Sequence, residues 1–443
     1  MSNNFKTWIR ESITVKFIVI GTLTLLLLIP AAMIRNLVEE RKERRDEVIR
    51  EISSKWGNAQ TITGPVLTVP FRKYQTNNNQ VTYTVHYAHF LPEELTIDGI
   101  LTPVERNRAL YKVVLYKSDL KVTGRFSHPD FGIWKTDPAT ILWDEAFITV
   151  GIPDMRGIKQ GVSIQFNGTP LEVNPGVPTR QIVSSGVSAR IPLHDTATGD
   201  YPFEFTLHLN GSESIEFVPL GKTTHVQLRA PWDSPSFDGA FLPDERELTD
   251  SSFVAQWTIL HLNRNFPQQW QGEEYDANYW SFGVNLKIPV DHYQKSERSV
   301  KYAIMFIALT FLTFFFSEVL NKKRVHPIQY LLIGFALCIF YVLLLSLSEQ
   351  IGFTWAYIVA AVANIVLITA YSASILKRRK LIVLVGFILV ALYTFLFTIL
   401  QLEDYSLLMG SIGLFIVMAL IMYLSRNVKW QGSGEKVEGV EDV

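Results

Sequence analysis

The sequence predicts a membrane protein with one N-terminal transmembrane helix, a large, mostly antiparallel β domain of sandwich-like type, and a C-terminal bundle of five transmembrane helices. Three observations lead to this prediction. Apolar runs long enough to cross a bilayer occur at both ends of the 443-residue chain. Apolar and polar residues alternate through its middle, as in strands with one buried face. Lys and Arg gather in alternate loops of the C-terminal part.

The overall composition hides this division. With 48% hydrophobic residues, 19% charged residues and a net charge of −1, the chain resembles an average soluble protein. Its mean hydropathy of +0.16 averages apolar and water-soluble segments. The near-neutral charge predicts no nucleic-acid partner, because binding to phosphates needs clustered Lys and Arg. The single cysteine, Cys338, excludes an intrachain disulfide and a multi-cysteine metal site.

A basic leader, residues 1–16, precedes the first predicted span, residues 17–34. A cleaved signal peptide has the same layout of basic leader and apolar stretch. The sequence favours an uncleaved anchor, because the apolar run ends in Met33-Ile34-Arg35 without a small-x-small cleavage site and continues into a charged segment. Apolar residues recur through that segment, residues 35–56, which is predicted to be a helix extending the anchor.

Five more spans follow in the C-terminal part, and at about 1.5 Å per residue each can cross a hydrocarbon core of roughly 30 Å. They are residues 302–320, 328–347, 351–376, 381–400 and 407–424. Glu318 is the one charged side chain within them. It precedes Lys322 by four residues, so the two are expected to pair along the helix.

The loops between these spans predict the orientation, because export of Lys and Arg in short loops is disfavoured. Basic residues occur in the connections 322–324 and 377–380 and in the tail, residues 425–443, whereas the connections 348–350 and 401–406 have none. Both termini are therefore expected in the cytoplasm, and the region between the first two spans outside it. The basic residues just after the first span favour the opposite orientation. We base the predicted orientation on the loops of the five later spans.

The exported region, residues 57–301, is predicted to be the β domain. Three hairpins are expected where a turn pair interrupts an alternating pattern, at Asp98-Gly99, Asn167-Gly168 and Asn210-Gly211. Further strands are predicted at residues 66–71, 81–89, 111–116, 120–126, 147–152, 225–228 and 282–288. A Phe-Leu-Pro-acidic-Glu motif occurs at residues 90–94 and again at 241–245, so an internal duplication remains an open alternative.

The sequence contains none of the zinc-protease, phosphate-loop or Gly-x-Ser-x-Gly motifs, and we predict no catalytic residue, no metal site and no cofactor. His86 and His89 form the closest histidine pair. Three residues apart on a strand, they point to opposite faces and are poor co-ligands for one metal. Both are expected to be ordinary, half-exposed strand residues.

The most distinctive loop spans residues 230–239 and carries two aromatic and two acidic side chains. Trp232 and Phe237, with Asp233 and Asp238, form a possible partner-binding surface with an aromatic centre and acidic edges. In the alternative interpretation the aromatic rings fold back onto the sheet and cap its core. That alternative is favoured, because exposed aromatic residues are unfavourable without a partner.

In the bundle, Ala356, Ala360 and Asn364 recur at helical spacing and predict a close helix–helix contact. A channel or transporter usually places ionisable residues inside its spans. Here we single out few interior polar side chains: Asn364, Ser372, Ser374 and Glu318. The bundle is therefore expected to be a packed platform rather than a conduit.

Several blocks of the chain, in the same order, resemble the CreD family of bacterial inner-membrane proteins, described as cell envelope integrity proteins. In the C-terminal part they are KYAI (301–304), IALTF (307–311), HPIQYLLIG (326–334) and LLLSLSE (343–349). In the exported domain they are LPEEL (91–95), YKSDL (116–120), DMRGI (154–158) and NGT (167–169).

The resemblance implies an inner-membrane protein with one N-terminal span, a large periplasmic domain and a C-terminal bundle. It also implies a role in envelope stress and in tolerance of colicins and β-lactams, under a two-component regulatory system, and supplies no catalytic residues. We expect a non-enzymatic envelope-integrity protein, embedded in membrane lipids, whose periplasmic β domain binds an envelope protein or a cell-wall component. A transporter or lipid-handling protein is the alternative, and an envelope hydrolase has the least support.

Overall fold

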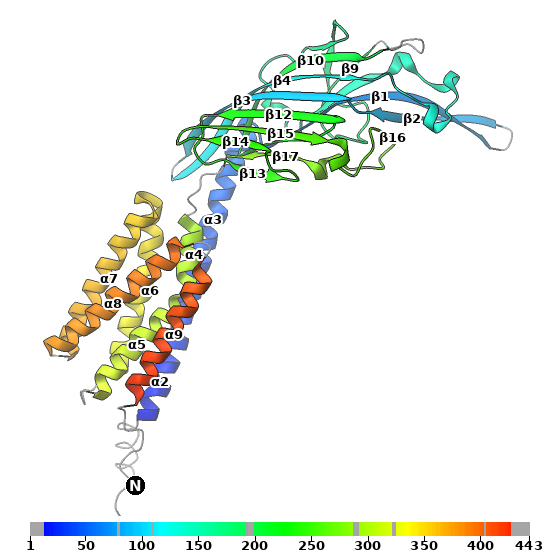
Figure 1. The fold of residues 1–443 in the computed structure, drawn as a ribbon. Helices are drawn as coiled ribbons and strands as arrows, with labels where there is room; N and C mark the ends of the chain where they lie inside the picture. Colours follow the sequence, from blue (N-terminus) through cyan, green and yellow to red (C-terminus); the bar gives the residue numbers. More distant parts are fainter. Residues whose placement is uncertain are drawn as a thin grey trace, which may run out of the picture. The chain divides into compact units, whose positions relative to one another are not determined.

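A computed structural model describes residues 13–77, 80–108, 110–191, 193, 199–286, 292–320, 325–376, 378–402 and 405–426. The chain divides into a helical unit, Met1–Arg44 with Val290–Val443, and a β unit, Arg45–Pro289. An N-terminal apolar helix, a mostly antiparallel β domain and several C-terminal apolar helices are present, which confirms the predicted fold class (Figure 1). The leader up to residue 12, the basic loop 321–324, Lys377, Glu403-Asp404 and the tail beyond residue 426 lie outside the described residues.

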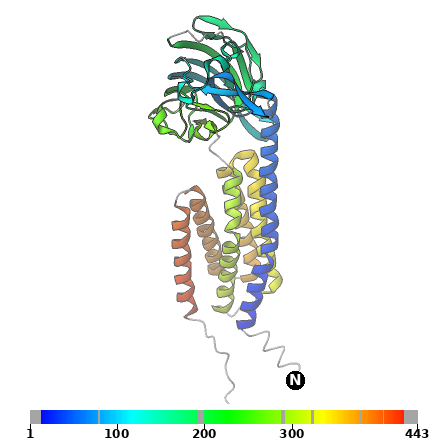
Figure 2. The ribbon, with the colours of Figure 1, turned by 90° about the vertical axis from the view of Figure 1, so that its right-hand side faces the viewer.

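The N-terminal part of the helical unit is longer than the predicted span. Helix α2 covers Ile13–Leu26, and α3 follows after an interruption at Leu27 and covers Leu28–Trp56. The predicted anchor, residues 17–34, is thus divided between α2 and the first turns of α3, and its charged extension, residues 35–56, forms the rest of α3. Among its neighbours α2 packs against α5 (Ala303–Leu320) and α6 (Pro327–Ile351) (Figure 2).

The remaining helices of this unit are α4 His292–Lys301, α7 Phe353–Leu376, α8 Arg379–Gln401 and α9 Ser406–Ser425. Within the described residues, four helical segments are long and apolar enough to cross a membrane, and a fifth qualifies if α4 and α5, which meet at a 45° bend, form one span. The apolar stretch of α9 is shorter, at Leu408–Leu420, so the span at residues 407–424 stays a prediction. The described helical part resumes at His292, earlier than the predicted boundary at residue 302.

The β unit consists of two sheets that share one hydrophobic core. In the described residues the first sheet has the order β13-β17-β11-β1-β5-β9-β8, with β2 beside β1 and β16 beside β2. Its strands are β1 Gln60–Asn77, β2 Gln80–Phe90, β5 Phe147–Gly151, β8 Val173–Pro175, β9 Gly186–Arg190, β11 Ser214–Phe217, β13 Ser236–Gly239, β16 Gln269–Gln271 and β17 Phe282–Asn285.

The second sheet has the order β14-β15-β12-β3-β4-β10-β6-β7. Its strands are β3 Glu94–Arg108, β4 Tyr111–Phe126, β6 Ile164–Phe166, β7 Thr169–Leu171, β10 Tyr201–Ser212, β12 Thr223–Ala230, β14 Glu245–Leu248 and β15 Phe253–Leu260. Most pairs are antiparallel, whereas β1 with β11 and β3 with β12 are parallel. Alternate residues of β3 and β10 are buried, so each strand contributes one face to the core.

One of the three predicted hairpins is confirmed. Phe166 of β6 pairs with Thr169 of β7 across a two-residue turn, in which Asn167 and Gly168 have φ of 49° and 77°. The hairpin predicted at Asp98-Gly99 is wrong, because β3 runs straight through both residues. A Cβ on Gly99 would lie 2.5 Å from a methyl group of Leu228, so this glycine is explained by close packing in a central strand.

The hairpin predicted at Asn210-Gly211 is also wrong. Strand β10 continues to Ser212, the chain turns at Glu213 with φ of 62°, and β11 then joins the other sheet. A Cβ on Gly211 would lie 2.2 Å from the Tyr116 hydroxyl, which donates a hydrogen bond to the Ser214 carbonyl at 2.7 Å. Gly211 therefore admits the buried tyrosine at the point where the chain changes sheets.

The repeated motif at residues 90–94 and 241–245 lies just before or at the starts of β3 and β14, which belong to the same sheet. Strand β3 is central and 15 residues long, whereas β14 is a four-residue edge strand. The internal duplication stays a prediction.

Substitution Gly211→Ala is expected to destabilise the β unit by about 1–3 kcal/mol, the usual effect of overpacking a filled core. The measurement is the urea concentration at the midpoint of unfolding, monitored by tryptophan fluorescence, of the full chain in detergent. Gly161→Ala is the matched control, because no atom lies within 4 Å of a Cβ built at Gly161. Equal midpoints for the two variants contradict the packing role of Gly211.

Candidate functional site

His89, on β2, lies in the interior of the β unit. Its side chain is 0% exposed, so the prediction of a half-exposed residue is wrong for His89. The imidazole Nδ1 lies 3.0 Å from the Thr68 hydroxyl, and Nε2 lies 3.0 Å from Oε1 of Gln181. Because Oε1 only accepts, Nε2 donates to Gln181 and Nδ1 accepts from Thr68. His86 is half-exposed, as predicted, with its ring 5.7 Å from that of Phe71.

The surroundings of His89 hold its imidazole neutral. Burial lowers the pKa of His89 from 6.5 to about 4, and the hydrogen bond to Gln181 opposes part of that shift. Both ring nitrogens already have partners in the neutral form. The residue is therefore a structural link between β1, β2 and the segment that carries Gln181, rather than a proton carrier near pH 7.

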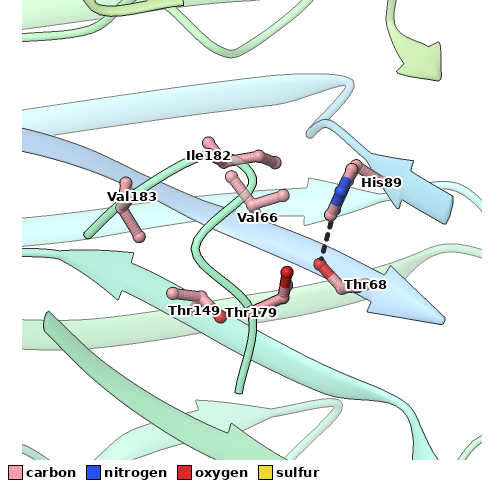
Figure 3. A pocket seen from close by; sticks show the side chains of 7 residues that line it. All are labelled: Val66, Thr68, His89, Thr149, Thr179, Ile182 and Val183. Carbon is pink, nitrogen blue, oxygen red and sulfur yellow. Dashed lines mark hydrogen bonds between the residues drawn. The ribbon is translucent and has the colours of Figure 1, made fainter. Parts of the chain in front are cut away.

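A small cavity lies beside His89 (Figure 3). Its volume of about 10 Å³ is the space needed for a single water molecule. It is lined by Val66, Thr68, His89, Thr149, Thr179, Ile182 and Val183. Figure 3 shows the segment with Thr179, Ile182 and Val183 passing over the strands that carry the other residues. Nearly all of the cavity surface is apolar, and a substrate is too large to enter.

The described residues contain no group of three or more His, Cys, Asp or Glu side chains placed to hold a metal ion. This observation applies to the described ranges of both units. It is in keeping with the position of His86 and His89 on opposite faces of β2.

The structure separates the four residues of the loop 230–239 into two environments. The ring of Phe237, in β13, lies 5.8 Å from those of Phe253 and Trp257 and packs against the core. Trp232 is half-buried and also packs against the core. Asp233 and Asp238 remain exposed. The aromatic residues thus cap the core, and partner binding by this loop stays a prediction.

In the helical unit, Ala356, Ala360 and Asn364 are buried on one side of α7. The Asn364 amide donates to the Ala336 carbonyl of α6 at 2.9 Å and to the Tyr393 hydroxyl of α8 at 3.0 Å. The Tyr357 hydroxyl donates to the Tyr393 carbonyl at 2.7 Å. Hydrogen bonds therefore join α6, α7 and α8 at this level.

The two serines of α7 behave differently from Asn364. Ser372 is buried and donates to the Ile368 carbonyl, and Ser374 is exposed and donates to the Tyr371 carbonyl. Both hydroxyl groups therefore satisfy their hydrogen bonds within their own helix, which is the usual behaviour of serine in an apolar helix.

Glu318 of α5 is 3% exposed and has partners on two other helices. It forms an ion pair with Lys16 of α2 at 2.7 Å and accepts a hydrogen bond from the Tyr330 hydroxyl of α6 at 3.2 Å. The partner expected from the sequence, Lys322, lies outside the described residues. Lys16 and Glu318 are 302 residues apart in the sequence, so helical spacing could not predict this ion pair. The pair links the N-terminal helix to the C-terminal helices.

Replacing His89 is expected to change how stability depends on pH. Because the folded state lowers the His89 pKa from 6.5 to about 4, its contribution is fully present above pH 6.5 and is lost progressively as the pH falls toward 4. The loss amounts to about 3 kcal/mol, at about 1.4 kcal/mol per pH unit. His89→Gln should therefore flatten the decline of the urea midpoint over this range.

The control for this measurement is His86→Gln, which removes a histidine from the opposite face of the same strand. If both variants alter the pH dependence of the urea midpoint equally, the burial of His89 is not the cause of the decline at low pH.

This chain is similar to known proteins over most of its length. The family described as Inner membrane protein CreD matches residues 12–431. The Inner membrane protein CreD of Escherichia coli (strain K12) is 33% identical over 412 residues, which cover 92% of this chain and 91% of that one. Among solved structures, an M1 zinc metallopeptidase from Deinococcus radiodurans aligns with 44% of this chain and 42% of its own, at 11% identity and a TM-score of 0.21, too low to inform the fold. The chain belongs to the CreD family of inner membrane proteins.

Proposed function

We propose that this protein maintains the cell envelope without catalysing a reaction, by binding a partner or a cell-wall component through a periplasmic β domain that the helical unit anchors in the inner membrane. One observation carries the proposal. Two polar side chains inside the helical unit, Asn364 and Glu318, form hydrogen bonds and an ion pair between helices. Membership of the CreD family supports the location in the inner membrane.

The β unit supports a binding role over a catalytic one. Acid–base catalysis needs a titratable group within hydrogen-bond reach of a substrate. His89 is fully buried with both nitrogens engaged, and the cavity beside it holds one water at most. Large exposed side chains on the surface of this unit remain available for a partner.

A transporter or lipid-handling role is the second candidate, and one observation favours it. The Tyr341 hydroxyl and Oδ1 of Asn364 are buried in the helical unit without a hydrogen-bond partner among the described residues. Unsatisfied polar atoms in an apolar interior call for an explanation, and a polar cargo or a water is one.

The proposed orientation places both termini in the cytoplasm and the β unit in the periplasm. Its basis is the run Arg378-Arg379-Lys380 at the start of α8, together with the basic residues of the other cytoplasmic loops. In a Cys338→Ala background, a membrane-impermeant maleimide should label Asp250→Cys in spheroplasts, and should label Arg379→Cys only after permeabilisation. Labelling in the reverse order contradicts the orientation.

The proposed function predicts that a deletion strain is sensitive to detergents and cell-wall antibiotics, and that the full chain restores its growth. The double substitution Asp233→Ser, Asp238→Ser should lower this rescue at unchanged abundance, because it removes the exposed half of the candidate loop. Asp250→Ser, at another exposed acidic position, is the matched control. Full rescue by the double variant contradicts the role of the loop.

The same assay separates the two candidates. Tyr341→Phe removes a buried hydroxyl without changing the size of the ring. For a binding protein this variant should rescue growth fully. Loss of rescue at normal abundance favours the transporter.

A further inference from the structure

The hairpin of β1 and β2 extends beyond the other strands of the β unit (Figure 1). We call residues 72–77 and 80–86 the β arm. Strand β5 pairs with β1 only up to Thr68, and β16 pairs with β2 only at Ala88–Phe90. Among the described residues, the two strands of the β arm therefore form ladders only with each other. The described side chains of the arm are exposed, except for the half-buried Arg72 and His86.

The two faces of the β arm differ in chemistry. The register places Tyr74 opposite Tyr83, Arg72 opposite Val85, and Thr76 opposite Val81. Residues opposite each other, and residues two apart, share a face. One face thus carries Arg72, Tyr74, Thr76, Val81, Tyr83 and Val85, and the other carries Lys73, Gln75, Gln80, Thr82, Thr84 and His86.

The apolar side chains of the first face are in solvent. The exposed fractions are 66% for Val81, 55% for Tyr83, 51% for Tyr74 and 44% for Val85. Exposed edge strands of natural proteins are usually protected by charge, proline or brevity. Residues 80–85 contain no charge, proline or glycine, and they favour extended structure. Such a surface indicates a site that another molecule covers.

The charge of the β arm indicates what that molecule is. The chain contains no Asp or Glu from residue 52 to residue 92, and the β arm carries Arg72 and Lys73. The Arg72 guanidinium lies 5.0 Å from the centre of the Tyr83 ring, so one cation sits within the apolar face. A complementary partner is therefore both anionic and able to accept valine and tyrosine side chains.

An anionic phospholipid surface meets both requirements. Tyrosine is enriched at the level of lipid headgroups, aliphatic side chains enter the acyl boundary, and Lys and Arg are attracted to anionic headgroups. A glycan suits the β arm less well, because the rings of Tyr74 and Tyr83 are inclined by 60° and form no flat platform for a sugar. A second copy of the arm brings its own cations and no acidic residue.

We propose that the β arm docks on an anionic phospholipid bilayer through the face that carries Arg72, Tyr74, Val81, Tyr83 and Val85. This inference rests on the proposed binding role of the β unit and names a lipid surface as its partner. Because the β unit is tethered to membrane helices at both ends, a weak affinity for lipid is enough to hold the arm on a bilayer.

The test uses the full Cys338→Ala chain with Val81→Cys carrying an environment-sensitive NBD dye. The protein is placed in nanodiscs of phosphatidylcholine and mixed with vesicles of the same lipid, or with vesicles that contain one-third phosphatidylglycerol. The dye emission should rise and shift to the blue only with the anionic vesicles. Anionic nanodiscs without vesicles test docking on the bilayer that holds the protein. Thr82→Cys, on the opposite face, is the control and should respond much less.

Variants of the β arm test its chemistry. Arg72→Gln, which removes the cation of the docking face, should weaken vesicle binding about fivefold, the factor expected for one cation at about 1 kcal/mol. Tyr83→Ser with Val81→Ser should weaken it as well, measured by vesicle flotation. Gln75→Ser with Thr82→Ser, on the polar face, should leave it unchanged.

Equal responses to neutral and anionic vesicles overturn the proposal, as does unchanged binding by the Arg72→Gln variant. If the chain fails to bind anionic vesicles but sediments with purified peptidoglycan, the partner of the β arm is a glycan and not a lipid. If it fails to bind the vesicles but binds polyglutamate, the partner is an acidic protein. A chain that rescues the deletion strain but ignores anionic vesicles overturns this inference alone. A chain that binds the vesicles but fails to rescue overturns the proposed function alone.

Discussion

The absence of water from the bilayer core is the constraint on which the rest of this structure depends. A polar group there has to find its partner inside the protein. The helical unit meets this requirement with contacts that join its helices: Asn364 links α7 to α6 and α8, and Glu318 links α5 to α2 and α6. Most charged residues of the chain are thereby confined to the β unit and the loops.

In the β unit, the polar groups between the end of α3 and the start of β1 need hydrogen-bond partners, because neither the helix nor the sheet supplies them. Just after α3, the backbone N–H of Asn58 donates to the Asp154 carboxylate at 2.9 Å. The Gln60 side chain donates to the backbone carbonyls of Asp154 and Asn210. Hydrogen bonds from Arg156 lower the pKa of Asp154 and keep its carboxylate ionised. This buried polar cluster joins the end of α3, the start of β1 and the end of β10, near the position where the chain changes sheets.

The helical unit and the β unit therefore differ in which polar groups are available for function. Inside the helical unit, Asn364 and Glu318 are held in contacts between helices, whereas the Tyr341 hydroxyl and Oδ1 of Asn364 have no hydrogen-bond partner among the described residues. In the β unit, burial neutralises His89, and the remaining chemistry lies on the surface, in the loop with Asp233 and Asp238 and in the β arm. The proposed binding role accounts for this distribution, and the proposed docking of the β arm names a lipid surface as the partner.

The sequence by itself determined what depends on neighbouring residues: the apolar helices, the buried alternation of β3 and β10, and the turn at Asn167-Gly168. These follow from local period and turn chemistry. Contacts between distant residues were decided only by the tertiary structure. Gly99 and Gly211 serve close packing instead of turns, His89 is buried by the segment that carries Gln181, and Lys16 pairs with Glu318. Each depends on residues far apart in the chain, whose approach no local pattern encodes.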